Sequence, residues 1–327
     1  MSISPNRGAR AAAPLALLAL SLASASASAQ STVKISGYLD IGMYRDSHSG
    51  VTQVGNIQRS NLAFSGTEDL GGGLSTFFNL STRFEMDTGA TEAGGRPFWH
   101  GESTVGMKGD FGSIKMGRAL DAMYSNDWNF DPWYYFDRVA SPAWDLWHFL
   151  YPSDPKANSG SADYGRLDNG VFYVSPTYAG FTLSASATPE RRTGDVGRGK
   201  SYSLNYSANG NAAMLSQGKN SANAEDTFVG LKTTVAGVAV MGAWDYSKSG
   251  TDRARSVTLG AQYNYEKFTY NLGWGKVDYN GTKYQSMFSG MVGYALSKRT
   301  SVYVDLARKN FASYDTTVYG GGISHSF

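Results

Sequence analysis

The chain has 327 residues, a length that allows one large domain or two ordinary ones. It contains no cysteine, which excludes disulfides and thiolate metal sites. Its 29 basic and 27 acidic residues nearly balance and form no basic block, which argues against nucleic acid as a partner. The composition is unlike that of two ordinary soluble domains, because it has 39 glycines, 21 tyrosines and 16 phenylalanines but only 9 prolines.

The N-terminus has the pattern of a cleaved secretory signal peptide. Arg7 and Arg10 precede an apolar run over residues 11–23, and Ala27-Ser28-Ala29 supplies a small-residue cleavage site. The apolar run is shorter than the roughly 20 residues of a membrane-spanning helix. We therefore predict a signal peptide over residues 1–29 and a mature domain over residues 30–327.

Alternation of apolar and polar side chains then runs through the whole mature chain. In residues 256–265, for example, Val257 and Leu259 alternate with Ser256 and Thr258. This period of two is typical of a strand with two different faces. Sixteen strands are predicted, near residues 33–45, 57–66, 74–85, 101–108, 113–118, 168–175, 181–189, 200–208, 211–217, 225–234, 238–247, 255–265, 268–277, 283–296, 300–309 and 315–327.

The connections between these strands alternate in length. Seven are tight turns and eight are mostly longer and polar, the longest being residues 119–167. Short periplasmic turns alternate with longer external loops in transmembrane barrels, where closure of the sheet satisfies every backbone polar group. The sequence thus predicts an all-β fold, a 16-stranded antiparallel transmembrane β-barrel with both termini periplasmic.

Several motifs resemble one known family, the general porins of Gram-negative outer membranes, particularly the trimeric type of β-proteobacteria. The resemblance covers the mature chain and is sharpest at the tight turns and the C-terminus. The motifs are Gly66-Thr67-Glu68-Asp69-Leu70-Gly71-Gly72-Gly73-Leu74, Gly109-Asp110-Phe111-Gly112, Gly117-Arg118, Ser175-Pro176 with Gly180-Phe181, Tyr294-Ala295-Leu296-Ser297-Lys298-Arg299-Thr300 and Gly322-Ile323-Ser324-His325-Ser326-Phe327.

The resemblance implies a water-filled channel for passive diffusion of small hydrophilic solutes and ions, without a cofactor. It also implies a homotrimer in the outer membrane, in contact with lipid and lipopolysaccharide, whose third loop folds into the barrel. The family's last strand is read by the barrel assembly machinery. Here Tyr319, Ile323 and Phe327 share one face of that strand and are the expected assembly signal.

A charged constriction is the expected functional site. The segment 119–167, the expected third loop, carries seven aspartates, among them Asp121, Asp127, Asp131 and Asp137, together with Arg138 and Lys156. Rings of charged side chains control selectivity in many pores. We expect these aspartates to face basic residues across the channel, unless the loop is only a solvated surface segment.

The expected basic side of the constriction is formed by three arginines. Strand alternation places Arg59 and Arg83 on the channel wall, and the family motif adds Arg118. Arg118 has the outward phase of its strand, so it reaches the channel only if the strand bends near Gly117. Asn61 and Gly101 stand where the family usually has wall arginines.

Three other functions remain as alternatives. Ten aromatic residues between 128 and 151 suggest a substrate-preferring channel that stacks sugars or aromatic solutes, although they could simply pack the loop against the wall. A structural or adhesin barrel would need long external domains, and only residues 119–167 are long. An enzyme is disfavoured, because none of the four histidines lies in a catalytic motif and His325 cannot pair with Ser324 or Ser326 on one strand face.

Overall fold

The computed structural model describes residues 32–92, 97–155 and 165–327. The predicted signal peptide lies outside the described residues, as do Lys156 and Asp163 of the long loop. Nearly all the described elements are strands. They are β1 (Thr32–Asp46), β2 (Thr52–Gly55), β3 (Ser60–Gly71), β4 (Leu74–Phe84), β5 (Glu102–Gly109), β6 (Gly112–Leu120), β7 (Arg166–Val174), β8 (Phe181–Ala187), β9 (Lys200–Ala208), β10 (Asn211–Lys219), β11 (Glu225–Val235), β12 (Val238–Ser249), β13 (Asp252–Tyr265), β14 (Phe268–Tyr279), β15 (Thr282–Ala295), β16 (Thr300–Phe311) and β17 (Asp315–Ser326).

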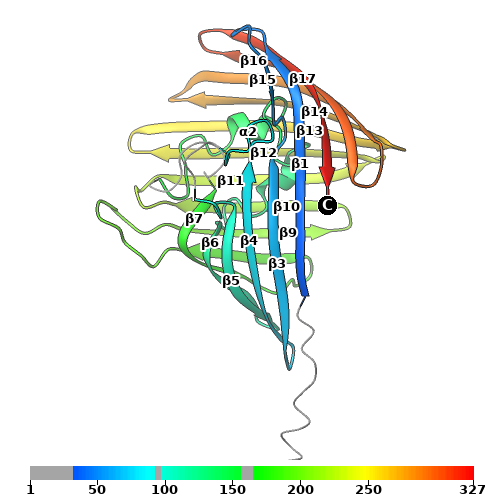
Figure 1. Ribbon diagram of the computed structural model, residues 1–327. Helices are drawn as coiled ribbons and strands as arrows, with labels where there is room; N and C mark the ends of the chain where they lie inside the picture. The colour runs from blue at the N-terminus through cyan, green and yellow to red at the C-terminus, as the bar shows by residue number, and fades with distance from the viewer. Residues whose placement is uncertain (1–31, 93–96, 156–164) are drawn as a thin grey trace, which may run out of the picture.

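The strands form one closed antiparallel sheet (Figure 1). Apart from β2 and β3, which do not pair with each other, each strand pairs with its neighbours in the chain, and β1 pairs with β17 to close the barrel. β2 and β3 both pair with β1, one after the other, so together they form a single membrane-spanning strand. The described chain therefore contains seventeen hydrogen-bonded strands but sixteen spans, which confirms the predicted 16-stranded barrel. Among the described residues, no helix has both the length and the apolar character to span a membrane.

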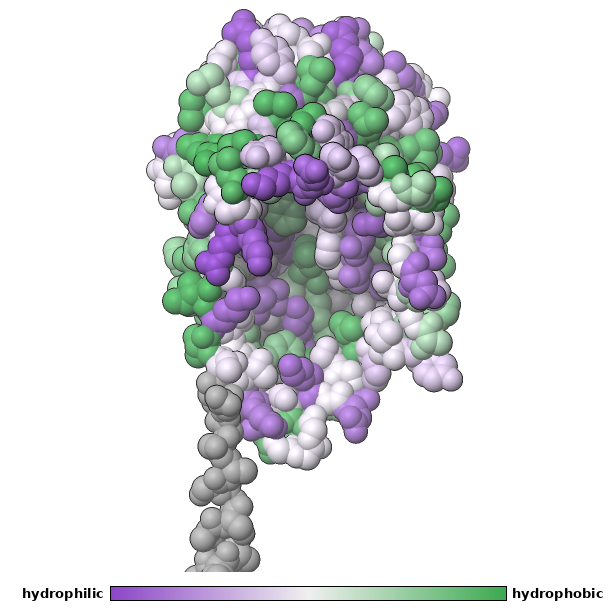
Figure 2. Space-filling view, turned by 90° about the vertical axis from the view of Figure 1, so that its right-hand side faces the viewer, coloured by the Kyte–Doolittle hydropathy of each residue, from purple (hydrophilic) through white to green (hydrophobic). Residues whose placement is uncertain are grey.

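The two faces of the strands differ as the alternation predicts. On β13, Leu259 is 57% exposed, whereas Ser256 and Thr258 face inward and are buried. Large apolar side chains occupy the outward positions around the barrel, including Leu231, Leu272 and Val304. The face drawn in Figure 2 is hollowed at its centre, with hydrophilic and hydrophobic residues mixed around the hollow.

The segment between β6 and β7, residues 121–165, is called the inward loop below. Its described part contains a 3₁₀ helix, η1 (Asp127–Phe130), and a short helix, α2 (Pro142–Leu146), which lies inside the barrel in Figure 1. The predicted inward fold is confirmed for the described part of this loop.

Glycines on neighbouring strands make room for the inward loop. A Cβ at Gly230 would lie 2.3 Å from the Phe130 ring, and one at Gly260 would lie 2.5 Å from Pro132. A Cβ at Gly273 would come within 2.7 Å of the Trp133 ring. A larger residue at these positions would therefore push the loop away from β11, β13 and β14.

Candidate functional site

The first predicted wall residue, Arg59, lies in an interruption of the second membrane span. Two extra residues stand opposite β1 between Gly55 and Asn61, so the strand pairing breaks there. The Asp40 carboxylate accepts hydrogen bonds from the backbone N–H groups of residues 57 and 58, at 2.9 and 2.7 Å. This explains why the strand predicted to begin at residue 57 begins at Ser60: a buried side chain satisfies the backbone that leaves the ladder.

The arginines on this side of the barrel share acidic partners from the second loop. Arg59 Nε lies 3.4 Å from Glu92 Oε1, and Arg83 Nη1 lies 3.8 Å from Glu92 Oε2. Arg138 of the inward loop donates to Glu92 at 3.1 Å and forms a two-pronged pair with Glu85 at 2.7 and 3.1 Å. The structure therefore brings Arg59 and Arg83 together, but around Glu92, a residue that the sequence did not single out.

The charge state of Glu92 follows from this arrangement. Burial by itself would raise the pKa of its carboxyl group, but the positive charges of Arg59, Arg83 and Arg138 outweigh burial. They lower the pKa of Glu92 to about 2. Glu92 is therefore ionised over the physiological pH range and holds three guanidinium groups together.

Arg118 lies in a β-bulge of β6. The expected bend of this strand next to Gly117 is therefore present. The register of β6 against β7 shifts between Gly117 and Ala119, and Gly117 has φ of +127°. Arg118 donates to the His100 carbonyl at 2.8 Å and pairs with the Asp168 carboxylate. Its side chain is therefore held between β5 and β7, and it does not line the main cavity.

A third arginine lines the cavity instead, and sequence reasoning missed it. Arg166, the first residue of β7, is buried and donates from Nε to the carbonyl of Gly101. Gly101 is one of the two positions where the resemblance expects a wall arginine. In the sequence, Arg166 lies at the end of the long acidic segment, just before the predicted strand 168–175. A basic residue at the start of a strand was the signal that could have identified it.

The four predicted loop aspartates have different surroundings. All four are buried, and Asp127 alone among them lines the main cavity. Asp131 accepts from the N–H groups of residues 133 and 135, and Asp137 accepts from those of residues 139 and 140. Asp121 accepts from Ser153 Oγ at 2.7 Å. Burial raises the pKa of Asp121 and Asp131 to about 6 and that of Asp137 to about 7.

These aspartates thus act first as acceptors that fold the loop. The structure does not bring Asp121, Asp131 or Asp137 against Arg59 or Arg83 in the cavity lining. A constriction role for Arg59, Arg83 and Asp127 stays a prediction.

The cavity between the wall and the inward loop has a volume of about 670 Å³. One side of it is basic and the other is largely aromatic. Its lining comprises Tyr38, Gln58, Arg59, Asn61, Arg83, Leu120 and Arg166 of the wall with Tyr124, Asp127, Trp128, Trp133, Tyr134, Tyr135, Phe136 and Gly165 of the inward loop. Arg59 also lies 4.4 Å from the ring centre of Trp144, so aromatic and basic groups are in direct contact.

The predicted assembly residues lie on the outside of the barrel. Tyr319, Ile323 and Phe327 are 48%, 44% and 42% exposed. The Phe327 backbone exchanges two hydrogen bonds of 3.1 Å with Gly37, which joins the C-terminus to the first strand. The geometry agrees with the predicted lipid-facing phase, and the recognition role itself stays a prediction.

Residues 16–313 match the sequence family described as Gram-negative porin, so the chain belongs to that family. Delftia acidovorans outer membrane porin protein 32 is 31% identical over 72% of this chain and 61% of that protein. Neisseria gonorrhoeae major outer membrane protein P.IB is 31% identical over 46% of this chain and 38% of that protein. The chain thus matches well under the full length of both. Family and fold place the protein in the outer membrane.

Solved structures show the same fold. The anion-selective porin from Comamonas acidovorans covers 91% of this chain and all of its own at a TM-score of 0.78 and 21% identity. The trimer form of Vibrio cholerae OmpT covers 91% of this chain and 99% of its own at a TM-score of 0.68 and 12% identity. At these identities the likeness concerns the barrel architecture.

Proposed function

We propose that this protein is a water-filled channel that lets small hydrophilic solutes and ions diffuse across the outer membrane. The observation that carries this proposal is the cavity of about 670 Å³ inside a closed barrel, bounded by buried arginines and an inward loop. A barrel of sixteen strands is too wide for side chains to fill, so it encloses water. Membership of the porin family supports a channel over an adhesin or structural barrel.

The constriction is the region where Arg59, Arg83 and Arg166 face Asp127 and the aromatic loop. Arg59, Arg83 and Arg166 line the cavity, and Arg138 lies beside them through Glu92, so four positive charges stand against Glu85 and Glu92. Asp127 is engaged by His148 and adds little free negative charge. Because positive groups are in excess, the channel prefers small anions. The Comamonas structure of the same fold is itself described as anion-selective.

Recordings in planar lipid bilayers test this function. The purified protein should give steps of ohmic conductance and, in a salt gradient, a reversal potential on the anion side. Changing Arg83→Ser and Arg166→Ser together should move that potential towards cations. Arg308→Ser is the matched control, because Arg308 lies on the outward face of β16 and pairs with Asp315 at 3.0 Å. Absence of conductance in the wild type would refute the channel, and an unshifted double variant would refute the constriction.

A second candidate is a channel that prefers flat or aromatic solutes. Trp128 and Tyr134 line the cavity and are 36% and 38% exposed, so their rings are accessible to a solute. Sugars and aromatic carboxylates should then block the current, and Trp128→Ala should abolish the block. A current that depends on solute size alone would leave only general diffusion.

The assembly is proposed to be a homotrimer in contact with outer-membrane lipid and lipopolysaccharide. The support is family membership and the trimer form of the Vibrio cholerae structure. Mass measurement in mild detergent should give three times the mass of one mature chain. A monomer under these conditions would refute the trimer without affecting the channel.

A further inference from the structure

A buried histidine joins the inward loop to the barrel wall. His148 follows α2 and is buried, and it has φ of +53°, in the left-handed region that non-glycine residues seldom occupy. A residue in such a strained conformation persists only where its surroundings impose it. Both the backbone and the side chain of His148 are held by carboxyl groups.

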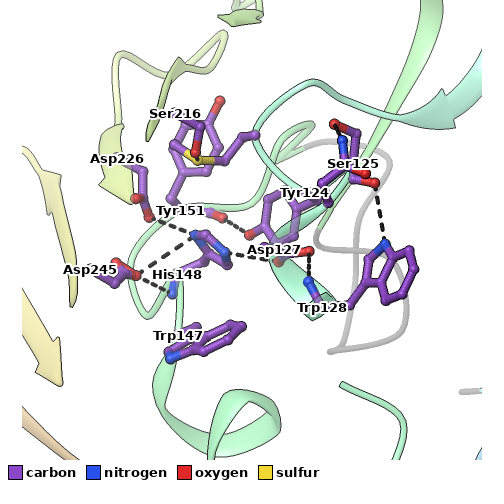
Figure 3. Close-up of polar contacts among 12 residues, drawn as sticks. Tyr124, Ser125, Asp127, Trp128, Trp147, His148, Tyr151, Ser216, Asp226 and Asp245 are labelled. Atoms are coloured by element: carbon purple, nitrogen blue, oxygen red, sulfur yellow. Dashed lines mark hydrogen bonds and ion pairs between the residues drawn. The ribbon is translucent and has the colours of Figure 1, made fainter. Parts of the chain in front are cut away.

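Both nitrogens of the His148 ring face carboxylates (Figure 3). Nε2 lies 3.2 Å from Asp127 Oδ2, on the other limb of the inward loop. Nδ1 lies 3.2 Å from Asp226 Oδ2 on β11 and 3.7 Å from Asp245 Oδ2 on β12. The backbone N–H of His148 donates to the same Asp245 oxygen at 2.6 Å.

This geometry favours a positively charged ring. A neutral imidazole has one donor and one acceptor nitrogen, whereas carboxylate oxygens facing both nitrogens require two donors. Where these carboxylates are ionised, the geometry favours the imidazolium form, in which both nitrogens donate. Burial by itself would lower the pKa of His148, but the charges of Asp226 and Asp245 and the hydrogen bonds to Asp127 and Asp226 raise it well above its usual value.

The groups that face this ring come from the loop and from two strands. Asp127 and the Tyr124 ring, whose centre is 4.1 Å away, belong to the loop, and Asp121 acts on His148 through its charge. Asp226 and Asp245 belong to β11 and β12. Carboxylates thus approach the imidazolium from both sides.

The contacts of His148 continue through Asp127 to the cavity. Asp127 Oδ1 accepts the backbone N–H of Trp128 at 2.7 Å, and Trp128 lines the cavity beside Asp127. On the other side of His148, Trp147 donates from its ring to Thr258 of β13 at 3.1 Å. The contact between His148 and Asp127 is therefore one of the links that hold Asp127 and Trp128 beside the cavity.

We propose that His148 is a positioning residue that, as an imidazolium, holds the Asp127 limb of the inward loop against Asp226 and Asp245 of the wall and so sets the open width of the channel. The proposal rests on the proposed channel function. A raised pKa means that this stabilisation is fully present below the pKa of an unfolded histidine and is lost as pH rises through the folded value. The loop is held at neutral pH and loosens at alkaline pH.

Single-channel recordings between about pH 6 and pH 10 test the proposal. Wild-type channels should carry a steady current without partial closures at neutral pH, and partial closures should appear as pH rises. His148→Gln keeps a polar side chain without the charge, and it should show those closures at all pH values with no pH dependence. Asp226→Asn should add little in the His148→Gln background, because the two residues act through one contact. His100→Gln is the control, since His100 is equally buried but lies against the Pro97 carbonyl.

The outcomes separate this proposal from the channel function. Two outcomes would overturn the role of His148 but leave the channel function intact. One is a conducting wild type without partial closures at alkaline pH, and the other is a His148→Gln channel whose current is as steady as that of the wild type. If a chelator such as EDTA reproduces the closures in the wild type, the bridging cation is a metal ion and the proposal is wrong. If His148→Gln does not fold, Asp127→Asn and the wild-type pH series decide the question.

Discussion

Arg59 Nε lies 3.4 Å from Glu92 Oε1, and both side chains are at most 5% exposed. This contact joins the interrupted second membrane span to the loop that follows β4. Because Arg83 and Arg138 approach the same carboxylate, one acidic residue holds wall and inward loop in one network.

Changing Glu92→Gln should weaken this network and make the proposed channel more selective for anions. Three guanidinium groups lose their shared negative charge, and the reversal potential should move further to the anion side. Shifting a carboxyl pKa from 4.5 to about 2 corresponds to about 3 kcal/mol, which bounds the loss of stability. Because the pKa is lowered, this contribution is fully present above about pH 4.5 and is lost as pH falls through about 2.

Glu225→Gln provides the comparison for Glu92. Glu225 also pairs with two cations, Lys219 and Lys248, but its side chain is 29% exposed at a strand end. The Glu225→Gln variant should therefore change neither the ion selectivity nor the stability of the protein appreciably. If the two variants changed selectivity and stability equally, the contacts of Glu92 with the three arginines would have no particular effect on ion selectivity.

Changing Asp137→Asn should remove a pH dependence of barrel stability. Burial and the negative charge of Asp40 raise the pKa of Asp137 to about 7, although its Oδ1 accepts two backbone N–H groups. The associated stability is fully present below about pH 4 and is lost as pH rises through about 7. Asparagine keeps the acceptor without the charge, so the variant should be more stable at pH 8 by roughly 1–4 kcal/mol.

The midpoint of thermal unfolding in detergent, measured at pH 5 and pH 8, checks this prediction. The control is Asp69→Asn, because Asp69 is exposed and likewise accepts a backbone N–H, that of Gly71, at 2.9 Å. A wild type with the same midpoint at both pH values would contradict the prediction.

Changing Gly117→Ala should destabilise the bulge that carries Arg118. Gly117 has φ of +127°, and a Cβ there would lie 2.1 Å from the Ser103 carbonyl oxygen. We expect a loss of about 1–3 kcal/mol, seen as a lower unfolding midpoint. Gly290→Ala on β15 is the control, because its nearest neighbour would be an ordinary 3.5 Å away. Equal midpoints for the two variants would be the contrary result.

Changing Phe327→Ala should reduce assembly in cells more than folding in detergent. The expected reason is loss of the terminal aromatic of the predicted assembly signal, on the outward face shared with Tyr319 and Ile323. The folded fraction is measured by heat-modifiable migration, in outer membranes and after refolding in detergent. Leu306→Ala removes a similarly exposed outward side chain from β16 and should affect both equally little. An equal loss for Phe327→Ala in both measurements would indicate only a packing role.

Much of the barrel could be predicted because its determinants are local. A strand in lipid must present apolar side chains outward at every second position, as Val257 and Leu259 do on β13, whatever lies elsewhere in the chain. Turns such as Asn209-Gly210, where both residues have positive φ, are also encoded by adjacent residues.

The partners inside the barrel could not be predicted in this way. Sequence alternation identified Arg59 and Arg83 as wall residues, but their partner Glu92 lies in a separate loop. Arg166 reaches the cavity from the end of a segment that appeared simply acidic.

The sequence alone determined the strands, their outward faces and the order of the turns, because these depend on neighbours along the chain and on the surrounding lipid. Only the tertiary structure decided that Asp127 meets His148, and that Asp226 and Asp245 meet it from the wall. The physical reason is closure: joining β17 to β1 fixes which strands face the inward loop, and that placement brings distant charges into contact.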